Sequence, residues 1–380
     1  MTDLRVLCLA EGDAVRGLSP ASRFRVYQLL PALAREGVHV DVRPSRPTKY
    51  VMGRAHWTSS PLRRRLARGA IVGAAGVMAL NRVPDILAAG GYDVVLLQRD
   101  LLPFRTVAPL LEQWVLRRNP RVVFDFDDAI FTHPGGQRRD AAGMLRDGDK
   151  IGHIVSKVRH VMAGNAYLAE FARRWNPNVT IVPTVVDTDV YAPAVRPPDD
   201  RVTIGWSGTH ANFPYMLALA PIIRQLGREH PIRLRIVNTP HALPMDFGDV
   251  EVHQTWWTPA TEISSLQEMD IGLMPLADDE WTRGKCGLKA LQYMACGVPC
   301  VLSPVGVNAE IVTSGANGLA ATTPDQWHAA LRALVEDAVL RKRLGEAARH
   351  TVETRYSVRR WAPEIAAILR RVAAGSADAG

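Results

Sequence analysis

Hydrophobic residues recur along the first half of the chain in short continuous runs, and stretches with helical spacing separate these runs. The apolar runs lie at residues 5–10, 38–42, 93–98, 121–125 and 179–182. From Phe24 to Glu36, apolar positions recur every three or four residues, as they do on one face of a helix. Continuous apolar strands that alternate with helices are typical of a parallel sheet covered on both faces.

The same alternation begins again after residues 187–200, a segment rich in Pro and Asp that we expect to be a linker. Further strands are expected at residues 202–206, 233–238, 251–253, 271–275 and 298–303. Further helices are expected at residues 215–229, 261–269, 287–296, 324–349 and 358–372. The pattern predicts an α/β protein with two doubly wound Rossmann-like domains, whose ligand loops follow the carboxyl ends of the strands.

The composition is that of a folded, water-soluble protein. The chain has 380 residues, of which 47% are hydrophobic and 22% charged, and this length suits two domains. Its four cysteines match no zinc signature and are too few for a disulfide scaffold, so we expect buried, reduced thiols. The start of the chain lacks the features of a signal peptide, and no segment is apolar for long enough to span a bilayer. We therefore expect a cytoplasmic protein.

Positive charge is concentrated in one stretch. No acidic residue occurs between Asp41 and Asp85, whereas nine Lys and Arg residues do, which exceeds the net charge of +8 of the whole chain. Within it, Arg63–Arg65 precede the apolar segment 69–80. Basic side chains beside a short apolar stretch suit an anionic membrane surface. An ordinary solvated surface is an equally good interpretation, and nucleic-acid binding is a poorer one because no nucleic-acid-binding motif accompanies the charge.

The most informative segment of the chain is residues 275–304. Here Gly284-Lys285-Cys286-Gly287 precedes the helix expected at residues 287–296. A glycine-containing turn before a helix exposes backbone N–H groups, and Lys285 and Lys289 add positive charge, so the segment suits a diphosphate. By spacing alone, an ordinary strand-to-helix turn explains it better.

Parts of this segment resemble the donor-site region of family-4 glycosyltransferases, which retain the anomeric configuration of the sugar and have the GT-B fold. The resemblance rests on Gly287-Leu288, Met294-Ala295-Cys296-Gly297-Val298-Pro299, Ser303–Val312, Asn317-Gly318-Leu319 and Leu344–Ala348. It covers most of residues 200–356, and the N-terminal half only in outline. It implies a GT-B architecture in which the C-terminal domain binds a nucleotide-diphosphate sugar.

Two positions depart from the pair of glutamates that this family usually carries. Gln292 stands where the second Glu usually binds the donor ribose, and Gly284 stands where the first Glu usually meets the sugar. Gln292 can still hydrogen-bond a ribose hydroxyl, although without charge. One of the acidic residues at 278–280 could take over the contact with the sugar.

The resemblance also assigns the contacts to the diphosphate. The Arg and Lys that the family carries after the first strand of its C-terminal domain are missing here. The backbone amides of Gly208 and Thr209 would take their place, and Lys285 would restore the lost charge. Gly287 and Leu288 begin the helix that faces the donor in the resembling enzymes.

A pair of tryptophans is a candidate for the nucleotide base. Trp256 and Trp257 follow the strand expected at 251–253, and the corresponding loop lines the base pocket in the resembling family. The ring of Trp256 could stack on a base, and plain packing of the two rings is an equally good interpretation.

Candidates in the N-terminal domain follow its first and fourth strands. Arg23 could clamp a phosphate or an acceptor, whereas Arg25 is expected to lie on the helix surface without a site role. The Asp-Phe-Asp sequence that ends at Asp127 imitates a metal motif, but GT-B enzymes usually work without a bound metal, so no metal is expected. Asp127 or Asp128 could orient an acceptor hydroxyl. His133 lies near the position of a cleft histidine in the resembling enzymes.

Together these observations predict a retaining hexosyl- or N-acetylhexosaminyltransferase with no cofactor beyond its nucleotide-sugar substrate. Residues 1–190 would form the acceptor domain, residues 200–356 the donor domain, and residues 357–380 a helix that packs back on the acceptor domain. The acceptor would be a glycan, a lipid-linked molecule or a small molecule. Two alternatives are a non-catalytic relative that binds a glycan or a protein partner, and a nucleotide-sugar epimerase, which needs no acceptor.

Overall fold

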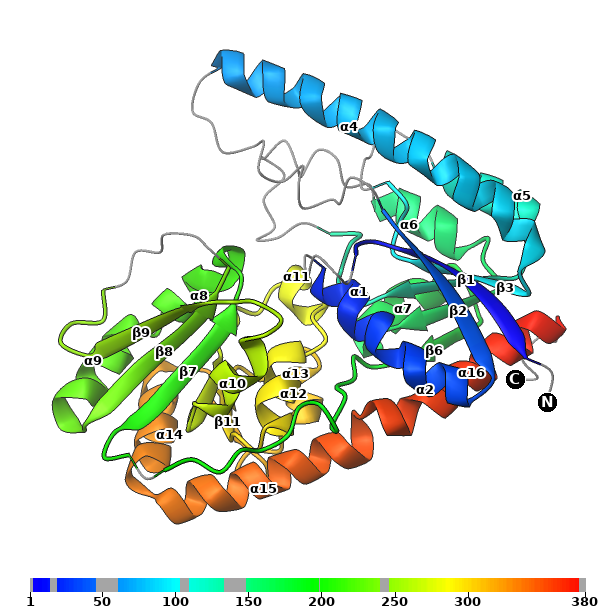
Figure 1. Ribbon diagram of the computed structural model, residues 1–380. Helices are drawn as coiled ribbons and strands as arrows, with labels where there is room; N and C mark the ends of the chain where they lie inside the picture. The colour runs from blue at the N-terminus through cyan, green and yellow to red at the C-terminus, as the bar shows by residue number, and fades with distance from the viewer. Residues whose placement is uncertain are drawn as a thin grey trace. The chain divides into compact units, whose positions relative to one another are not determined.

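The computed structural model describes residues 3–13, 19–45, 61–102, 109–132, 148–197, 199–239 and 246–375. The chain forms two compact units (Figure 1). The N-terminal unit comprises Met1–Thr184, Asp279–Lys285 and Trp361–Gly380. The C-terminal unit comprises Val185–Asp278 and Cys286–Arg360. The short segment 279–285 thus belongs to the first unit although the second unit surrounds it in sequence.

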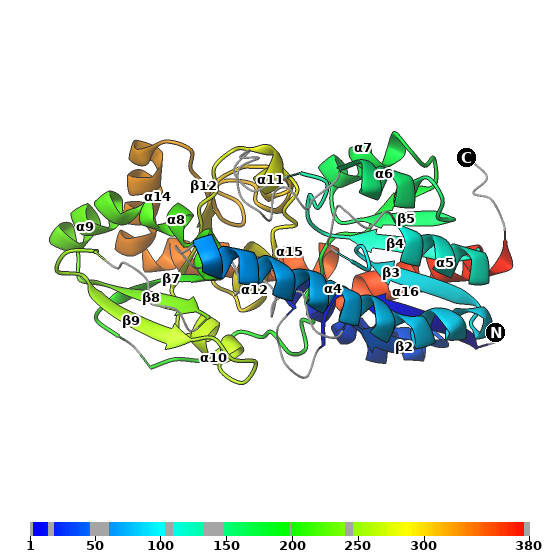
Figure 2. The same ribbon diagram turned by 90° about the horizontal axis from the view of Figure 1, so that it is seen from above.

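The N-terminal unit contains a parallel sheet with helices on its two faces (Figure 2). In the described residues the sheet has six strands in the order β2-β1-β3-β4-β5-β6. They are β1 (Leu4–Ala10), β2 (Val38–Pro44), β3 (Val94–Gln98), β4 (Val122–Phe126), β5 (His160–Ala163) and β6 (Val179–Ile181). The helices are α1 (Pro20–Arg25), η1 (Tyr27–Leu29), α2 (Leu30–Arg35), α4 (Pro61–Ala88), η3 (Ala89–Gly91), α5 (Leu110–Arg118), α6 (Gly148–Val155), α7 (Ala166–Arg173) and α11 (Glu280–Arg283).

The C-terminal unit repeats this architecture. Its described strands are parallel in the order β12-β11-β10-β7-β8-β9. They are β7 (Val202–Gly208), β8 (Ile232–Asn238), β9 (Glu251–Trp256), β10 (Ile271–Met274), β11 (Cys300–Leu302) and β12 (Leu319–Ala320). The helices are η6 (His210–Asn212), α8 (Phe213–Leu217), α9 (Ala220–Glu229), α10 (Glu262–Gln267), α12 (Leu288–Ala295), α13 (Asn308–Ile311), α14 (Pro324–Glu336) and α15 (Ala338–Arg355). Two parallel sheets with this wrapping confirm the predicted α/β fold with two Rossmann-like domains.

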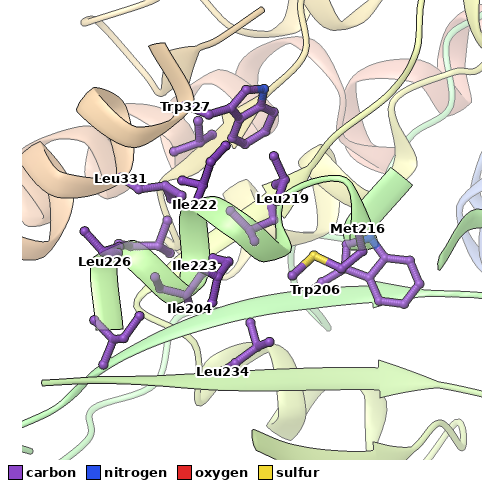
Figure 3. Close-up of a cluster of buried hydrophobic side chains, with 14 of the residues drawn as sticks. Ile204, Trp206, Met216, Leu219, Ile222, Ile223, Leu226, Leu234, Trp327 and Leu331 are labelled. Atoms are coloured by element: carbon purple, nitrogen blue, oxygen red, sulfur yellow. The ribbon is translucent and has the colours of Figure 1, made fainter. Parts of the chain in front are cut away.

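A cluster of apolar side chains fills one face of the C-terminal sheet (Figure 3). Ile204 of β7 and Leu234 of β8 meet Ile223 of α9, and Trp327 and Leu331 of α14 lie over that helix. Each large apolar side chain buried in this way contributes about 1.5–3 kcal/mol. Strands β10 and β11 are buried along their whole length, which agrees with the continuous apolar runs that predicted them, whereas β9 is partly exposed.

Three expected helices are interrupted in the structure, and the one expected over residues 215–229 is divided into α8 and α9. The helix expected over residues 324–349 breaks at Asp337, whose side chain accepts a hydrogen bond from the Leu340 backbone N–H at 2.8 Å and so begins α15. The helical pattern from Phe24 to Glu36 is divided because α2 begins with Pro31 in its first turn, and a proline inside a helix removes a backbone hydrogen bond.

The last helix, α16 (Val358–Ala374), begins in the C-terminal unit and continues into the N-terminal unit. Within the N-terminal unit, the Arg370 side chain donates a hydrogen bond to the Glu36 carbonyl, and Arg159 donates one to the Gly375 carbonyl. These contacts fix the end of the chain beside α2 and the edge of the sheet.

All four cysteines are buried as free thiols, as expected from the sequence. Burial raises the pKa of Cys300 to about 12, which keeps this thiol protonated and unreactive. In the described part of the chain, no helix is both long enough and apolar enough to cross a membrane.

Arg25 does not lie on the helix surface, and that expectation was wrong. Its Nε donates to Asp125 Oδ2 at 3.1 Å, its Nη2 donates to Asp125 Oδ1, and its Nη1 donates to the Val182 carbonyl at 2.6 Å. Both charged side chains are buried. Burial raises the pKa of Asp125 and the Arg25 charge opposes that rise, so each group depends on the other for its charged state.

We expect Arg25→Met to destabilise the N-terminal unit by about 3–5 kcal/mol, because it leaves a buried carboxylate without its partner. Urea unfolding followed by circular dichroism measures the change. Arg35→Met, at an exposed position of α2, is the matched control and should change the free energy of unfolding by less than about 0.5 kcal/mol. Adding Asp125→Leu to Arg25→Met should recover part of the loss. Equal stability of the two single variants would contradict the assignment.

Candidate functional site

In the C-terminal unit, helix α12 begins beside the carboxyl end of β7. Tyr293 of α12 makes the connection: its hydroxyl accepts a hydrogen bond from Ser207 N at 2.8 Å and donates one to the Leu273 carbonyl at 3.3 Å. Burial raises the pKa of Tyr293 well above its usual value, so the hydroxyl keeps its proton. The tyrosine therefore fixes α12 to β7 and β10 together.

Lys289, in the first turn of α12, lies at the end of β7. Its Nζ is 4.9 Å from the centre of the Trp206 ring, and a Cβ added at Gly208 would lie 2.8 Å from that Nζ. The same Cβ would lie only 2.5 Å from the Trp206 ring, so glycine at this position leaves room for the indole first and for the ammonium group beside it. Gly208 and Thr209 are partly exposed beside this positive charge.

Gly287 is required by the backbone at the start of α12. Its φ is +69°, which lies in the left-handed region, and an added Cβ would lie 2.2 Å from Ile311 Cδ1. Leu288 follows as the first residue of the helix and is half-buried. The Gly-Leu pair at this turn therefore has a structural cause that does not depend on a ligand.

Lys285 belongs to the N-terminal unit, unlike Lys289. Its Nζ is 5.4 Å from the centre of the Trp281 ring. The Asn165 side chain holds this segment by donating hydrogen bonds to the carbonyls of Arg283 at 3.3 Å and Lys285 at 3.0 Å. Of the two lysines, Lys289 is the one that lies against Gly208 in the same unit.

The glycine at position 284 has a packing reason. A Cβ added there would lie 2.4 Å from Ala129 Cβ and 2.7 Å from Ala129 N, so only glycine fits against this loop. The acidic side chains of Asp279 and Glu280 also accept hydrogen bonds within the N-terminal unit. Asp279 caps α11 by accepting from Thr282 N at 2.7 Å, and Glu280 accepts from Thr132 Oγ1 at 3.2 Å.

Gln292 is part of a buried polar cluster that sequence reasoning missed. Its Nε2 donates to Glu262 Oε1 at 3.0 Å and to the Tyr191 hydroxyl at 3.3 Å. Glu262 also accepts from the Tyr191 hydroxyl at 2.5 Å and from Trp257 Nε1 at 2.9 Å. The carboxylate of this region is therefore on α10, and an amide is needed at position 292 to donate a hydrogen bond to it. No signal in the sequence links residue 262 to residue 292.

The two tryptophans at the end of β9 have different surroundings. The Trp257 side chain donates a hydrogen bond to Glu262. The residue Trp256 is 47% exposed to solvent. Trp256 is thus the more exposed of the two tryptophans, and its role in base stacking stays a prediction.

In the N-terminal unit, Asp127 lies in an ion-pair network at the carboxyl ends of β1, β3 and β4. Arg99 donates from Nε to Asp127 Oδ1 at 2.9 Å and from Nη2 to Asp128 Oδ2 at 2.6 Å, and its Nη1 lies 3.2 Å from Glu11 Oε2. Arg99 has φ +61°, a conformation that costs a residue other than glycine about 1 kcal/mol or more. Arg99 directly follows β3, and this position at the carboxyl end of a strand is the signal in the sequence that could have identified it.

Two further candidates remain. Arg23 of α1 is half-buried, and its guanidinium carbon lies 4.4 Å from the centre of the Phe24 ring. His133 lies outside the described residues. The structure thus gathers Gly208, Lys289 and the start of α12 in one unit, and Arg99 and Asp127 in the other.

We expect Gly284→Ala to destabilise the N-terminal unit by about 1–3 kcal/mol, since the new methyl group overlaps Ala129. The matched control is Gly76→Ala in α4, where nothing lies within 4 Å of the added Cβ and removal of a helical glycine should stabilise by about 0.5–1 kcal/mol. Chemical denaturation of both variants gives the comparison. A Gly284→Ala protein as stable as the wild type would show that the contact with Ala129 is absent.

We also expect Gln292→Glu to destabilise the C-terminal unit by about 1–3 kcal/mol at neutral pH, because it replaces a donor to buried Glu262 with a second acceptor. Gln225→Glu is the matched control. That residue is exposed, and its Nε2 donates to Glu229 Oε1 at 3.0 Å, so the same exchange on the surface should cost about 0.2–0.5 kcal/mol. Thermal unfolding separates the two. Similar losses in both variants would refute the special role of the Glu262 cluster.

Comparison with known proteins identifies the type of fold and the sequence pattern of the C-terminal unit. Residues 202–337 match the model of the family described as glycosyl transferases group 1. No curated protein matches the chain in sequence.

Solved structures resemble the whole chain. Sucrose-phosphate synthase from Thermosynechococcus elongatus has a TM-score of 0.73 and 16% identity, with 98% of this chain and 100% of that chain covered. A glycosyltransferase from Rickettsia africae has a TM-score of 0.67 and 11% identity, with 99% and 100% covered. HepE from Anabaena, in complex with UDP and glucose, has a TM-score of 0.67 and 13% identity, with 97% and 99% covered. The family model matches residues 202–337 alone, and these solved structures show that the whole chain has the predicted two-domain GT-B fold.

Proposed function

We propose that the protein transfers a hexosyl or N-acetylhexosaminyl group from a nucleoside-diphosphate sugar to a hydroxyl acceptor, with retention of configuration. The observation that carries this proposal is the position of Lys289. Its ammonium group lies over Trp206 and beside Gly208, at the carboxyl end of β7, where doubly wound sheets bind their ligands.

In this proposal the donor diphosphate lies across the Gly208–Thr209 backbone. Lys289 and the amides at the start of α12 then stabilise the negative charge that develops when the sugar–phosphate bond breaks. Lys289 thereby takes over the task that the sequence assigned to Lys285. Lys285 and Arg23 belong to the N-terminal unit, and we propose them as further phosphate contacts. No metal is required for this distribution of charge.

The nucleoside would be held by Gln292 and Trp256. The hydrogen bonds from Gln292 to Tyr191 and Glu262 both use Nε2, so in this proposal its Oε1 accepts a hydrogen bond from a ribose hydroxyl. The exposed ring of Trp256 offers a face for stacking on the base. Because the similar protein HepE is described in complex with UDP and with UDP-glucose, uridine is the base to test first.

The acceptor would bind in the N-terminal unit, where Asp127 would orient its hydroxyl, and the role of His133 follows from the family resemblance alone. Retention is proposed from the family resemblance, with the departing phosphate helping to remove the acceptor proton on the same face of the sugar. The positions of Asp127 and Lys289 supply orientation and charge stabilisation, which suits a reaction limited by positioning.

We expect UDP to raise the unfolding temperature of the wild-type protein, and Lys289→Ala to weaken UDP binding about 10- to 100-fold, because a charge-assisted contact is worth about 1.5–3 kcal/mol. Titration calorimetry with UDP, GDP, ADP and dTDP makes the measurement. Lys342→Ala, at an exposed position of α15, is the matched control and should bind like the wild type. The affinity of Lys285→Ala for UDP, measured in the same way, shows whether Lys285 or Lys289 contributes more to binding of the diphosphate.

Equal affinities of Lys289→Ala and Lys342→Ala would contradict the diphosphate site. Incubation with a UDP-sugar and a panel of acceptors then distinguishes the functions. A glycosylated product whose anomeric configuration matches that of the donor supports retaining transfer, whereas conversion of the nucleotide sugar without an acceptor indicates an epimerase. A folded protein that binds none of the nucleotides would be a non-catalytic relative.

A further inference from the structure

Helix α4 has one face that is firmly packed on the N-terminal unit. Met78 and Ile86 are buried on this face. Between them, Arg82 is also buried, and it donates hydrogen bonds from Nη2 to the Ala10 carbonyl at 2.6 Å and from Nη1 to the Arg43 carbonyl at 2.7 Å. These contacts fix the rotation of the helix about its axis, so they also determine which face is turned outward.

The outward face is apolar. Val77, Leu80 and Leu87 are 50%, 71% and 47% exposed, and their spacing of three and seven residues places them on one side of the helix. The backbone of α4 is helical from Pro61 onward, and the same period passes through positions 62, 66, 73 and 84. Those positions hold Leu62, Leu66, Gly73 and Pro84. We call the exposed face defined by Val77, Leu80 and Leu87 the outer face of α4.

Positive charge is concentrated in the N-terminal part of the α4 sequence. Its first two turns contain Arg63, Arg64, Arg65 and Arg68, and its first acidic residue is Asp85. The preceding segment 42–60 adds four more positive charges and no negative one. An exposed apolar stripe beside a dense positive charge is complementary to an anionic lipid surface, which offers acyl chains and phosphate groups side by side.

We propose that the outer face of α4 binds an anionic lipid bilayer, with the helix lying in the plane of the interface. Leu80 and Val77 enter the boundary between headgroups and acyl chains, and the net positive charge of the helix sequence attracts the anionic headgroups. This orientation agrees with the lack of a helix, in the residues described, that could cross the membrane. The inference does not depend on the donor site, and it would bring the N-terminal unit to a surface where lipid-linked acceptors are found.

The experiment is sedimentation of the full-length protein with vesicles of phosphatidylcholine alone or of phosphatidylcholine with 40 mol% phosphatidylglycerol. We expect binding to the second kind only, weakened by raising NaCl, since each arginine near the surface contributes about 1 kcal/mol, or roughly fivefold in the partition coefficient. Leu80→Glu should lower that coefficient at least about tenfold, because it removes an inserted apolar side chain and adds a negative charge.

Val339→Glu is the matched control, since Val339 of α15 is 79% exposed and apolar but lies far from the basic segment in sequence. It should bind vesicles like the wild type. Both variants should unfold at the wild-type temperature and respond equally to UDP, which keeps this test separate from that of the donor site.

Three results would overturn the proposal. The first is a wild-type protein that does not sediment with anionic vesicles. The second is equal binding by Leu80→Glu and Val339→Glu. The third is a wild-type dimer, seen by light scattering, that Leu80→Glu dissociates without any change in vesicle binding, because the outer face would then be an interface between two copies of the chain.

Discussion

The geometry of the proposed donor site depends on one buried hydroxyl. Tyr293 reaches from α12 to Ser207 of β7 and to Leu273 of β10, and Gly272 leaves room for its ring, since an added Cβ there would lie 2.5 Å from it. Because the surroundings keep the phenol protonated, it can accept one hydrogen bond and donate another at the same time. The position of every functional side chain on α12 follows from this anchor.

The Tyr293 anchor and the cluster around Glu262 determine which way Lys289 and Gln292 of α12 face. Lys289 faces the end of β7, where it supplies the positive charge of the proposed phosphate site, and Gln292 faces α10, where it donates a hydrogen bond to a buried carboxylate. The exchange of glutamate for glutamine at position 292 is therefore compensated inside the protein. A buried acid remains in the region, but it is held by Tyr191 and Trp257 and belongs to another helix.

Arginines of the N-terminal unit have separate tasks that their sequence positions do not distinguish. Arg25 is buried with Asp125 and holds α1 against the sheet, whereas Arg99 lies half-buried at the strand ends with Asp127 and Asp128. Arg82 serves as a structural tie that turns the apolar face of α4 outward. Three arginines of the N-terminal unit thus serve structural contacts within it.

The sequence by itself determined the parallel strands and the two-domain α/β organisation, because buried parallel strands are continuously apolar. It also determined the glycine turn before α12, because the left-handed backbone there favours glycine. Short-range chemistry could also have located the cap at Asp337. Only the tertiary structure decided that Lys289 approaches Gly208, that Glu262 meets Gln292 and that Gly284 packs on Ala129, since each of these pairs is separated by 30 or more residues. Their contacts arise from how helices and loops pack on the finished sheets, and side-chain burial of this kind leaves no periodic signal in the chain.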